Sequence, residues 1–257
     1  DGQYVVRVTN PITGVWGENE GFFAIRPYLV CWDGTGEFPS IQAALNAAAD
    51  GAVIELCDGT FTGSGNRDLD FQGKSLTLRS RSGDAEACIL DCEGNGAGIR
   101  FNDDEGALAV VEEITIRAAA QGAIYCYQSS PTIRGCVLRD NLRADGFGGG
   151  AILCQEAAPS FEDCRVQDNV LQGDPDRVSG GGAHLFLSTV TFTRCDFETN
   201  QCLNPSNPSF CPPGGGVAVE RGSLELRECN FRNNETHSGE GGAVHLSEGA
   251  VATLDDC

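Results

Sequence analysis

The feature that most constrains this chain is a phrase that recurs five times in its second half. Each copy opens near glycine and carries a cysteine, and the first four close on asparagine. The copies read QGAIYCYQSSPTIRGCVLRDN (121–141), GGGAILCQEAAPSFEDCRVQDN (148–169), GGAHLFLSTVTFTRCDFETN (181–200), GGVAVERGSLELRECNFRNN (215–234) and GGAVHLSEGAVATLDDC (241–257). The corresponding cysteines lie 28, 31, 34 and 28 residues apart. Self-similarity at a period of about 20–50 residues predicts a stack of structural repeats.

The residue pattern inside the units narrows the architecture. From residue 75 onward, apolar runs such as SLTLRS (75–80), GIRF (98–101) and LAVVEEITIR (108–117) alternate with turn residues, and no helical pattern separates them. The units also lack the blade signature of a propeller. The sequence therefore predicts an all-β fold, a parallel β-helix solenoid in which each repeat forms one coil.

Stacked coils would place equivalent side chains above one another, about 4.8 Å apart. The repeated cysteines would then form an inward-facing ladder of small apolar side chains, with a second, shorter ladder at Cys126 and Cys154. The repeated asparagines fall at strand ends, where they would bond to one another and tolerate left-handed backbone. The expected ladder positions are Cys136, Cys164, Cys195, Cys229 and Cys257, and Asn141, Asn169, Asn200 and Asn234. We expect both ladders to be structural, since buried cysteines are usually inert.

The chain divides into a strand segment over 1–27 and a β-helix over 28–257. Within the second region, residues 31–61 predict a short helix that caps the open end of the core, with Pro39 in its first turn. The apolar positions on one helical face are Phe38, Ile41, Ala44, Leu45 and Ala48. A strand over 52–56 follows. The last repeat stops mid-coil at Cys257, so we expect the β-helix to be truncated there and to continue in a longer chain or contact a neighbour.

Residues 1–27 follow a different pattern. YVVRV (4–8) alternates apolar and polar residues as a half-buried strand does, NPITG (10–14) has turn chemistry, and FFAI (22–25) suggests a second strand. The stretch resembles the last strands of an immunoglobulin-like β-sandwich of secreted bacterial proteins. The alternative is an N-terminal extension that packs on the β-helix.

Two longer segments resemble known families. DGTGEFPSIQAALNAAADGAVIELCDGTFTG (33–63) is similar to the capping segment of the pectin-lyase-like superfamily of right-handed parallel β-helices. The Gly149-Gly150-Ala151-Ile152 start with Phe161 and Asn169 resembles repeats of polymorphic outer-membrane proteins, which are autotransporter-type surface adhesins. These resemblances imply a right-handed coil over about 31–257. They leave function open, because this fold hosts lyases, hydrolases, esterases and adhesins.

Charge and cysteine content restrict the environment and the partners. The formal net charge is −20, which disfavours nucleic acid and anionic lipid, and no apolar run is long enough to span a membrane. The 13 cysteines favour an oxidising, extracellular compartment. Cys31 and Cys57 end two apolar strands and are candidates for a disulfide, as are Cys202 and Cys211, which bracket a Pro-rich insert. No cofactor is expected, although an acidic surface could hold calcium.

Motifs of the superfamily's enzymes are missing. NDD at 102–104 partly matches the hydrolase pattern, but neighbouring Asp103 and Asp104 diverge in extended backbone and fit a solvated acidic turn better. The motifs typical of pectate lyases and pectin methylesterases are absent from the sequence. His184 and His245 follow their glycine pairs at different offsets and are expected to point to opposite faces, and His237 is expected in a turn. All three fit surface or packing roles.

The variable inserts after each asparagine are the candidate binding surface. They span 142–147, 170–179, 201–213 and 235–240 and should emerge along one edge of the stack. Their polar candidates for ligand binding are Asp145, Asp174, Asp176 and Arg177. The alternative is that these are tolerated insertions without a ligand.

Two functions remain. The first is a non-enzymatic, secreted or cell-surface repeat protein with a structural, adhesive or self-assembly role, whose partners are copies of itself, further domains or a cell-surface polysaccharide. The second is a carbohydrate-active lyase or hydrolase in which acidic residues near 102–113 and 174–176 bind calcium or act as acid and base. Low aromatic content favours the first, because stacking platforms for sugars would be scarce.

Overall fold

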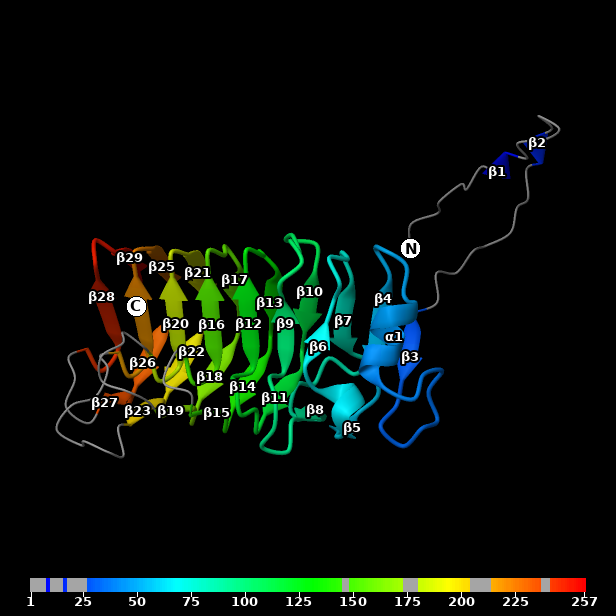
Figure 1. Ribbon diagram of the computed structural model, residues 1–257, viewed down its shortest axis with the longest axis horizontal. Coiled ribbons are helices and arrows are strands. Elements are labelled where there is room, and N and C mark those ends of the chain that lie inside the picture. Colours follow the sequence, from blue (N-terminus) through cyan, green and yellow to red (C-terminus); the bar gives the residue numbers. More distant parts are fainter. Residues whose placement is uncertain are drawn as a thin grey trace.

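The computed structural model is a rod of stacked coils (Figure 1). It describes residues 8–9, 16–17, 27–144, 148–172, 180–203, 214–236 and 241–257. Each complete repeat passes in turn through three long parallel sheets, and from residue 142 onward through a short fourth one. The parallel β-helix predicted from the repeats is confirmed, because strands of successive coils pair in register.

The sheets are named here I to IV. Sheet I contains β3 (Tyr28–Val30), β4 (Val53–Leu56), β7 (Thr77–Ser80), β10 (Val110–Glu112), β13 (Thr132–Arg134), β17 (Ser160–Glu162), β21 (Thr189–Thr193), β25 (Ser223–Arg227) and β29 (Val251–Asp255). Sheet II contains β5 (Gly59–Phe61), β8 (Cys88–Asp91), β11 (Thr115–Arg117), β14 (Val137–Arg139), β18 (Arg165–Gln167), β22 (Asp196–Glu198) and β26 (Asn230–Arg232). Sheet III contains β6 (Leu69–Asp70), β9 (Ile99–Phe101), β12 (Ile124–Tyr127), β16 (Ile152–Gln155), β20 (Ala183–Phe186), β24 (Val217–Glu220) and β28 (Val244–Ser247). Sheet IV contains β15 (Leu142–Arg143), β19 (Val170–Gln172), β23 (Gln201–Leu203) and β27 (Glu235–Thr236).

The cysteine ladder forms as predicted. Cys136, Cys164, Cys195 and Cys229 are buried, and each thiol donates to the carbonyl two residues earlier in the chain. Cys257 is exposed and makes the same contact to the carbonyl of residue 255. The second ladder is also confirmed, since Cys126 and Cys154 are register partners on sheet III. The core therefore holds sulfur at matching positions in successive coils.

The asparagine ladder also forms as predicted. The side-chain amide of Asn141 donates to Oδ1 of Asn169 at 2.9 Å, that of Asn169 to Asn200 at 2.9 Å, and that of Asn200 to Asn234 at 2.9 Å. The left-handed backbone expected of these asparagines belongs instead to the preceding residue, as at Asp140 (φ 55°). The preceding residue makes the corner, which leaves the asparagine side chain free to turn inward and cap the neighbouring coil.

The capping helix covers one end of the rod. Helix α1 (Ile41–Ala47) begins after Ser40, whose hydroxyl accepts from the Ala43 amide, so Pro39 precedes the helix instead of occupying its first turn. Its buried face includes the predicted Ile41, Ala44 and Leu45. A single 3-10 turn, η1 (Ser64–Asn66), lies beside it, and Asn66 accepts from the first helical amide. The helix thus closes the apolar end of the stack.

The predicted Cys31–Cys57 disulfide is present and joins the residues that directly follow β3 and β4, with the two Cα atoms 4.8 Å apart. Of the N-terminal region, the structure describes β1 (Val8–Thr9) and β2 (Trp16–Gly17), which pair antiparallel. The division at residues 27 and 28 and the immunoglobulin-like resemblance remain predictions. In the described part of the chain, no helix has the length and apolar content needed to cross a membrane.

Candidate functional site

The outer face of sheet III carries two outward rows of side chains. The first row runs Asp70, Arg100, Tyr125, Leu153, His184, Ala218 and His245, and the second runs Tyr127, Gln155, Phe186, Glu220 and Ser247. The prediction that His184 and His245 point to opposite faces is wrong, because both occupy the first row. The number of residues between the glycine pair and the histidine differs in the two coils because Gly182 of one coil corresponds to Ala243 of the last coil.

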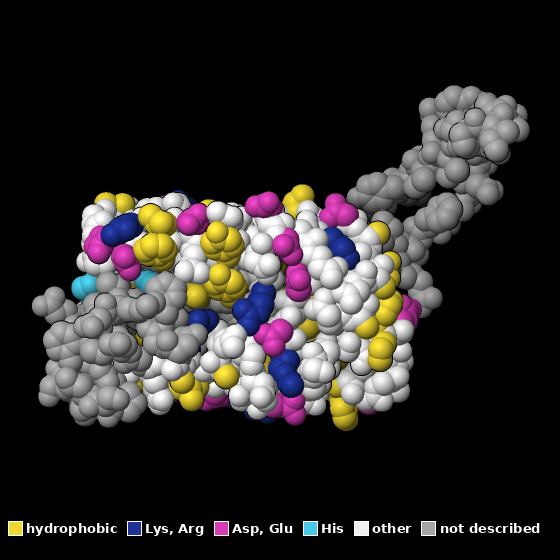
Figure 2. Space-filling model, in the orientation of Figure 1, with side chains coloured by type: hydrophobic (Ala, Val, Ile, Leu, Met, Phe, Trp, Pro, Cys, Tyr) yellow, Lys and Arg dark blue, Asp and Glu magenta, His cyan; other side chains and the backbone are white. Residues whose placement is uncertain are grey.

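Aromatic side chains concentrate in the middle of this face. Tyr127 is 37% exposed, and Phe186, two coils further along the same row, is half-buried. Tyr125 donates from its hydroxyl to Oε1 of Gln155 at 2.9 Å, and the Arg100 guanidinium lies 6.0 Å from the Tyr125 ring centre. Figure 2 shows hydrophobic side chains gathered over β12 to β20 on the front of the rod. Aromatic platforms were expected to be scarce on the coils, and Tyr127 and Phe186, both partly exposed, share one row of this face.

One flank of the face is closed by sheet IV. A Cβ atom on Gly150, Gly181 or Gly215 would come within 3.0 Å of the backbone of a sheet IV residue, so the chain crosses itself tightly at these glycines. The first residues of each insert form the strands of sheet IV, which the sequence had placed in loops. This close crossing explains the repeated glycine pairs.

His184 is the buried titratable group beneath this flank. Its Nε2 atom lies 3.9 Å from Oε2 of Glu220. Burial, helped by the charge of Arg143, lowers the pKa of His184 to about 4. Burial also raises the pKa of Glu220 above its ordinary value. The histidine is therefore held neutral at neutral pH and serves as a packing residue, as expected.

Several predicted site residues lie outside the described residues. They are Asp145, Asp174, Asp176, Arg177, Cys211 and His237. The ligand-binding role of the four polar residues and the Cys202–Cys211 pairing therefore stay predictions. Cys202 itself is buried on β23, one coil above Leu171.

An acidic cluster lies near the corner that follows β9. Asp70, Asp103 and Glu105 place one oxygen each within 4.8 Å of one another. Glu105 is buried and accepts from the amides of Gly73 and Asp103 and from the hydroxyl of Ser129. Reduced hydration, with smaller contributions from Asp70 and Glu105, raises the pKa of Asp103. The oxygen donors suit calcium, but Glu105 already anchors the loop through backbone contacts, which favours the acidic-turn interpretation of Asp103 and Asp104.

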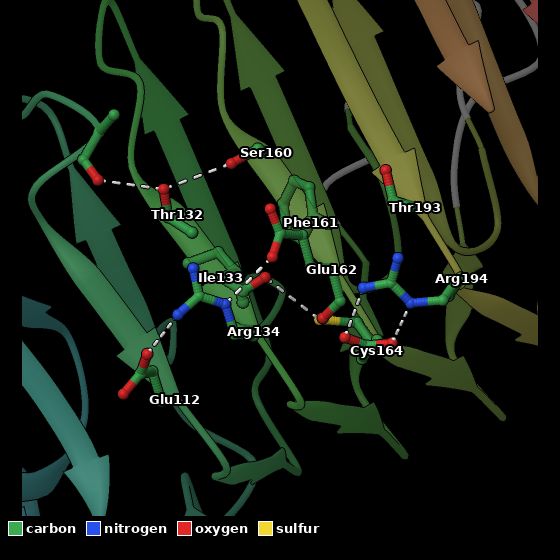
Figure 3. Close-up of polar contacts among 12 residues, drawn as sticks. Glu112, Thr132, Ile133, Arg134, Ser160, Phe161, Glu162, Cys164, Thr193 and Arg194 are labelled. Atoms are coloured by element: carbon green, nitrogen blue, oxygen red, sulfur yellow. Dashed lines mark hydrogen bonds and ion pairs between the residues drawn. The ribbon is translucent and has the colours of Figure 1, made fainter. Parts of the chain in front are cut away.

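The outer face of sheet I is dominated by ion pairs. Figure 3 shows the Arg134 guanidinium between two carboxylates, with Glu112 2.7 Å away on one side and Glu162 3.1 Å away on the other. Arg194 lies at the next corner and forms two bonds to Asp163, of 2.7 and 2.9 Å. The signal in the sequence for this pattern is the residue two before each ladder cysteine, which is charged in four of the five repeats.

The buried cysteines are poorly suited to chemistry. Burial raises the pKa of the Cys88 thiol to about 12, and that of Cys136 to about 12. A hydrogen bond with Cys164 raises the pKa of Cys195 as well. Because the thiolate is the reactive form of cysteine, these side chains are held as inert thiols. The raised pKa values of Cys136 and Cys195 agree with the structural role expected of the ladder.

The coils, the capping helix and the ladders together define a right-handed β-helix protein. Residues 81–257 match the model of the right-handed β-helix region, and the chain belongs to this family. Among solved structures it is similar to pectin methylesterase from carrot, with 12% identity over 87% of this chain and 89% of that one and a TM-score of 0.43. It is also similar to the pectin methylesterase of Aspergillus niger, with 12% identity over 88% and 91% of the two chains and a TM-score of 0.46. No curated protein sequence matches the chain.

Proposed function

We propose that this chain is a non-enzymatic β-helix module of a secreted or cell-surface protein and that it adheres to a polysaccharide along the outer face of sheet III. The observation that carries the proposal is the placement of Tyr127 and Phe186 in one row, two coils apart and partly exposed on the outer face of sheet III. The repeated cysteines and asparagines support a scaffold role, because their side chains bond to the neighbouring coil along the stack. The Cys31–Cys57 disulfide supports an oxidising location.

The spacing of the aromatic side chains suits an extended glycan. Tyr127 and Phe186 are two coils apart in one row, which corresponds to about 10 Å. This distance matches the disaccharide repeat of an extended chain lying along the rod, so the two aromatic rings would contact alternate sugar residues. Aromatic rings bury the apolar face of a sugar, and Gln155 between them offers an amide for a sugar hydroxyl. Glu156 and Glu220 beside the row disfavour a polyanion, so we propose a neutral polysaccharide.

Binding is tested with soluble neutral glucans, mannans and galactans by affinity electrophoresis and calorimetry. The substitutions Tyr127→Ala and Phe186→Ala should each weaken binding about ten-fold, since a buried aromatic contact contributes about 1–2 kcal/mol. Trp32→Ala is the matched control, because Trp32 is an exposed aromatic residue on the capping end of the rod. Equal losses in all three variants, or no binding by the unaltered protein, would refute the proposal.

A carbohydrate-active enzyme is the second candidate, and the acidic cluster is the observation that favours it. A carboxyl group with a raised pKa, such as Asp103 beside Asp70, can act as a general acid. Release of reducing ends or unsaturated sugars from any tested polysaccharide, abolished by Asp103→Asn, would establish this function in place of the first.

A further inference from the structure

The outer face of sheet I carries one column in which charge alternates along the rod. The column occupies one outward position of successive strands and reads Glu55, Arg79, Glu112, Arg134, Glu162, Thr193, Arg227 and Asp255. Its sign therefore changes at every step over the first five coils. Neighbours pair along the column at 2.7 Å between Arg79 and Glu55, and at 2.7 and 3.1 Å on the two sides of Arg134.

The neighbouring outward row of sheet I consists of short side chains, so the surface there is flat. It runs Val53, Thr77, Val110, Thr132, Ser160 and Thr191 from β4 to β21, and Glu225 follows on β25. Small and β-branched side chains lose little conformational freedom when they are covered. The row is half-buried already, apart from the buried Thr132. A second flat sheet could therefore approach this row closely.

We propose that the outer face of sheet I binds a second copy of this chain in an antiparallel, two-fold symmetric dimer. A two-fold axis parallel to the strands and passing between β10 and β13 lays the charged column against itself in reverse order. Glu112 then faces the partner's Arg134, and Arg79 faces the partner's Glu162. Each contact occurs twice by symmetry, which places opposite charges together over the four central coils.

The same symmetry explains why one copy, and not a stack of copies, would bind. An isologous contact uses the same patch on both subunits, so the assembly closes at two. Leu108, two residues before β10, is 74% exposed beside the proposed axis and offers an apolar contact. Because exposed ion pairs contribute little each, the dimer should be weak, specific in orientation and sensitive to salt. This inference concerns a face other than the proposed glycan site.

Two charge variants test the pairing directly. In the first, Arg79→Glu with Arg134→Glu makes the central column acidic, and in the second, Glu112→Arg with Glu162→Arg makes it basic. Each variant alone should dimerise at least about ten-fold more weakly than the unaltered chain, and an equimolar mixture should form a heterodimer. Sedimentation equilibrium and native mass spectrometry measure both quantities, with circular dichroism as the test of folding.

The matched control is Arg227→Glu, which reverses a charge in the same column outside the four central coils, where no charge of the partner faces it. Arg227 would face the partner's Leu29, so this variant should dimerise like the unaltered chain. If the double variants do not fold, the unaltered dimer should still dissociate when salt is raised from about 0.05 M to about 0.5 M, where charges are screened over a few ångströms. A monomer at every concentration, or a dimer unaffected by salt and by all three variants, would overturn the inference. Glycan binding is measured separately, so the two proposals fail independently.

Discussion

Replacing Asn169 with alanine should destabilise the rod far more than a single exposed polar residue would. Its Oδ1 atom accepts from the backbone amide of Asn141 at 3.1 Å and from the side chain of Asn141 at 2.9 Å. Its amide donates to Oδ1 of Asn200 at 2.9 Å and to the carbonyl of Leu138 at 2.8 Å. All four residues are buried, so water cannot replace the lost partner.

The magnitude follows from the groups that lose a partner. Asn169→Ala removes the partner of the Asn141 backbone amide and of the Leu138 carbonyl, and it breaks two side-chain bonds of the ladder, one to Asn141 and one to Asn200. At about 1–3 kcal/mol for each buried group, the free energy of unfolding should fall by at least about 3 kcal/mol. Asn234→Ala is the matched control, because Asn234 is a half-exposed ladder residue at the end of the row. Its loss should be about 1 kcal/mol, since water can reach the groups left behind.

Urea unfolding followed by circular dichroism measures both variants, and hydrogen exchange of the Asn141 amide locates the effect. This amide should exchange faster in Asn169→Ala than in Asn234→Ala. If exchange requires global unfolding, the ratio of the two rates should correspond to the difference between the unfolding free energies of the two variants. Equal destabilisation by the two substitutions would show that the ladder bonds do not act as buried hydrogen bonds. Rods of stacked repeats can unfold in parts, so the transitions are compared at two probes.

Three further predictions follow from burial and covalent links. Burial raises the pKa of the Cys136 thiol to about 12, so iodoacetamide at about pH 8 should label Cys257 and leave Cys136 unmodified in the folded protein, as read by peptide mass spectrometry. Removing the Cys31–Cys57 disulfide, whose residues are 26 apart, with serine at both positions should lower the free energy of unfolding by about 3–4 kcal/mol in urea titrations. Burial lowers the pKa of His184 to about 4, so between about pH 6.5 and pH 4 the unfolded chain binds the proton that the folded chain refuses. Stability should therefore fall by about 3 kcal/mol as pH drops through this window, and His184→Leu should remove that part of the slope.

The stacking direction of the fold could be predicted because identical residues mark it. Because a cysteine and an asparagine occupy matching places in the units, stacking the units with these residues aligned is the simplest arrangement. Both ladders form in the structure. The cap was predictable for a similar reason, since Ile41, Ala44 and Leu45 repeat at helical spacing. The helix begins later than predicted, because Ser40 caps its first turn and Pro39, expected within that turn, precedes the cap.

Features that depend on pairing across coils were harder to predict. The register of His184 and His245 was miscounted because Ala243 occupies a position that is glycine in the preceding coils. Sheet IV was missed because strands of two or three residues are too short to show alternation. The aromatic content of the whole chain does not show that Tyr127 and Phe186 share one row, because that depends on the register of three coils. A low aromatic content over the whole chain is therefore compatible with two aromatic side chains in one row of sheet III.

The distances between ladder asparagines have a consequence for how such a rod can change. Successive asparagines are 28, 31 and 34 residues apart, yet their side chains meet at the same 2.9 Å. The extra residues therefore enter the chain between sheet IV and sheet III without altering the register of the neighbouring coils. A gene encoding this rod can gain or lose codons at that one place in each repeat while the core keeps its contacts. The length of the chain between sheet IV and sheet III can therefore vary from repeat to repeat, whereas the ladder positions in the core keep their spacing.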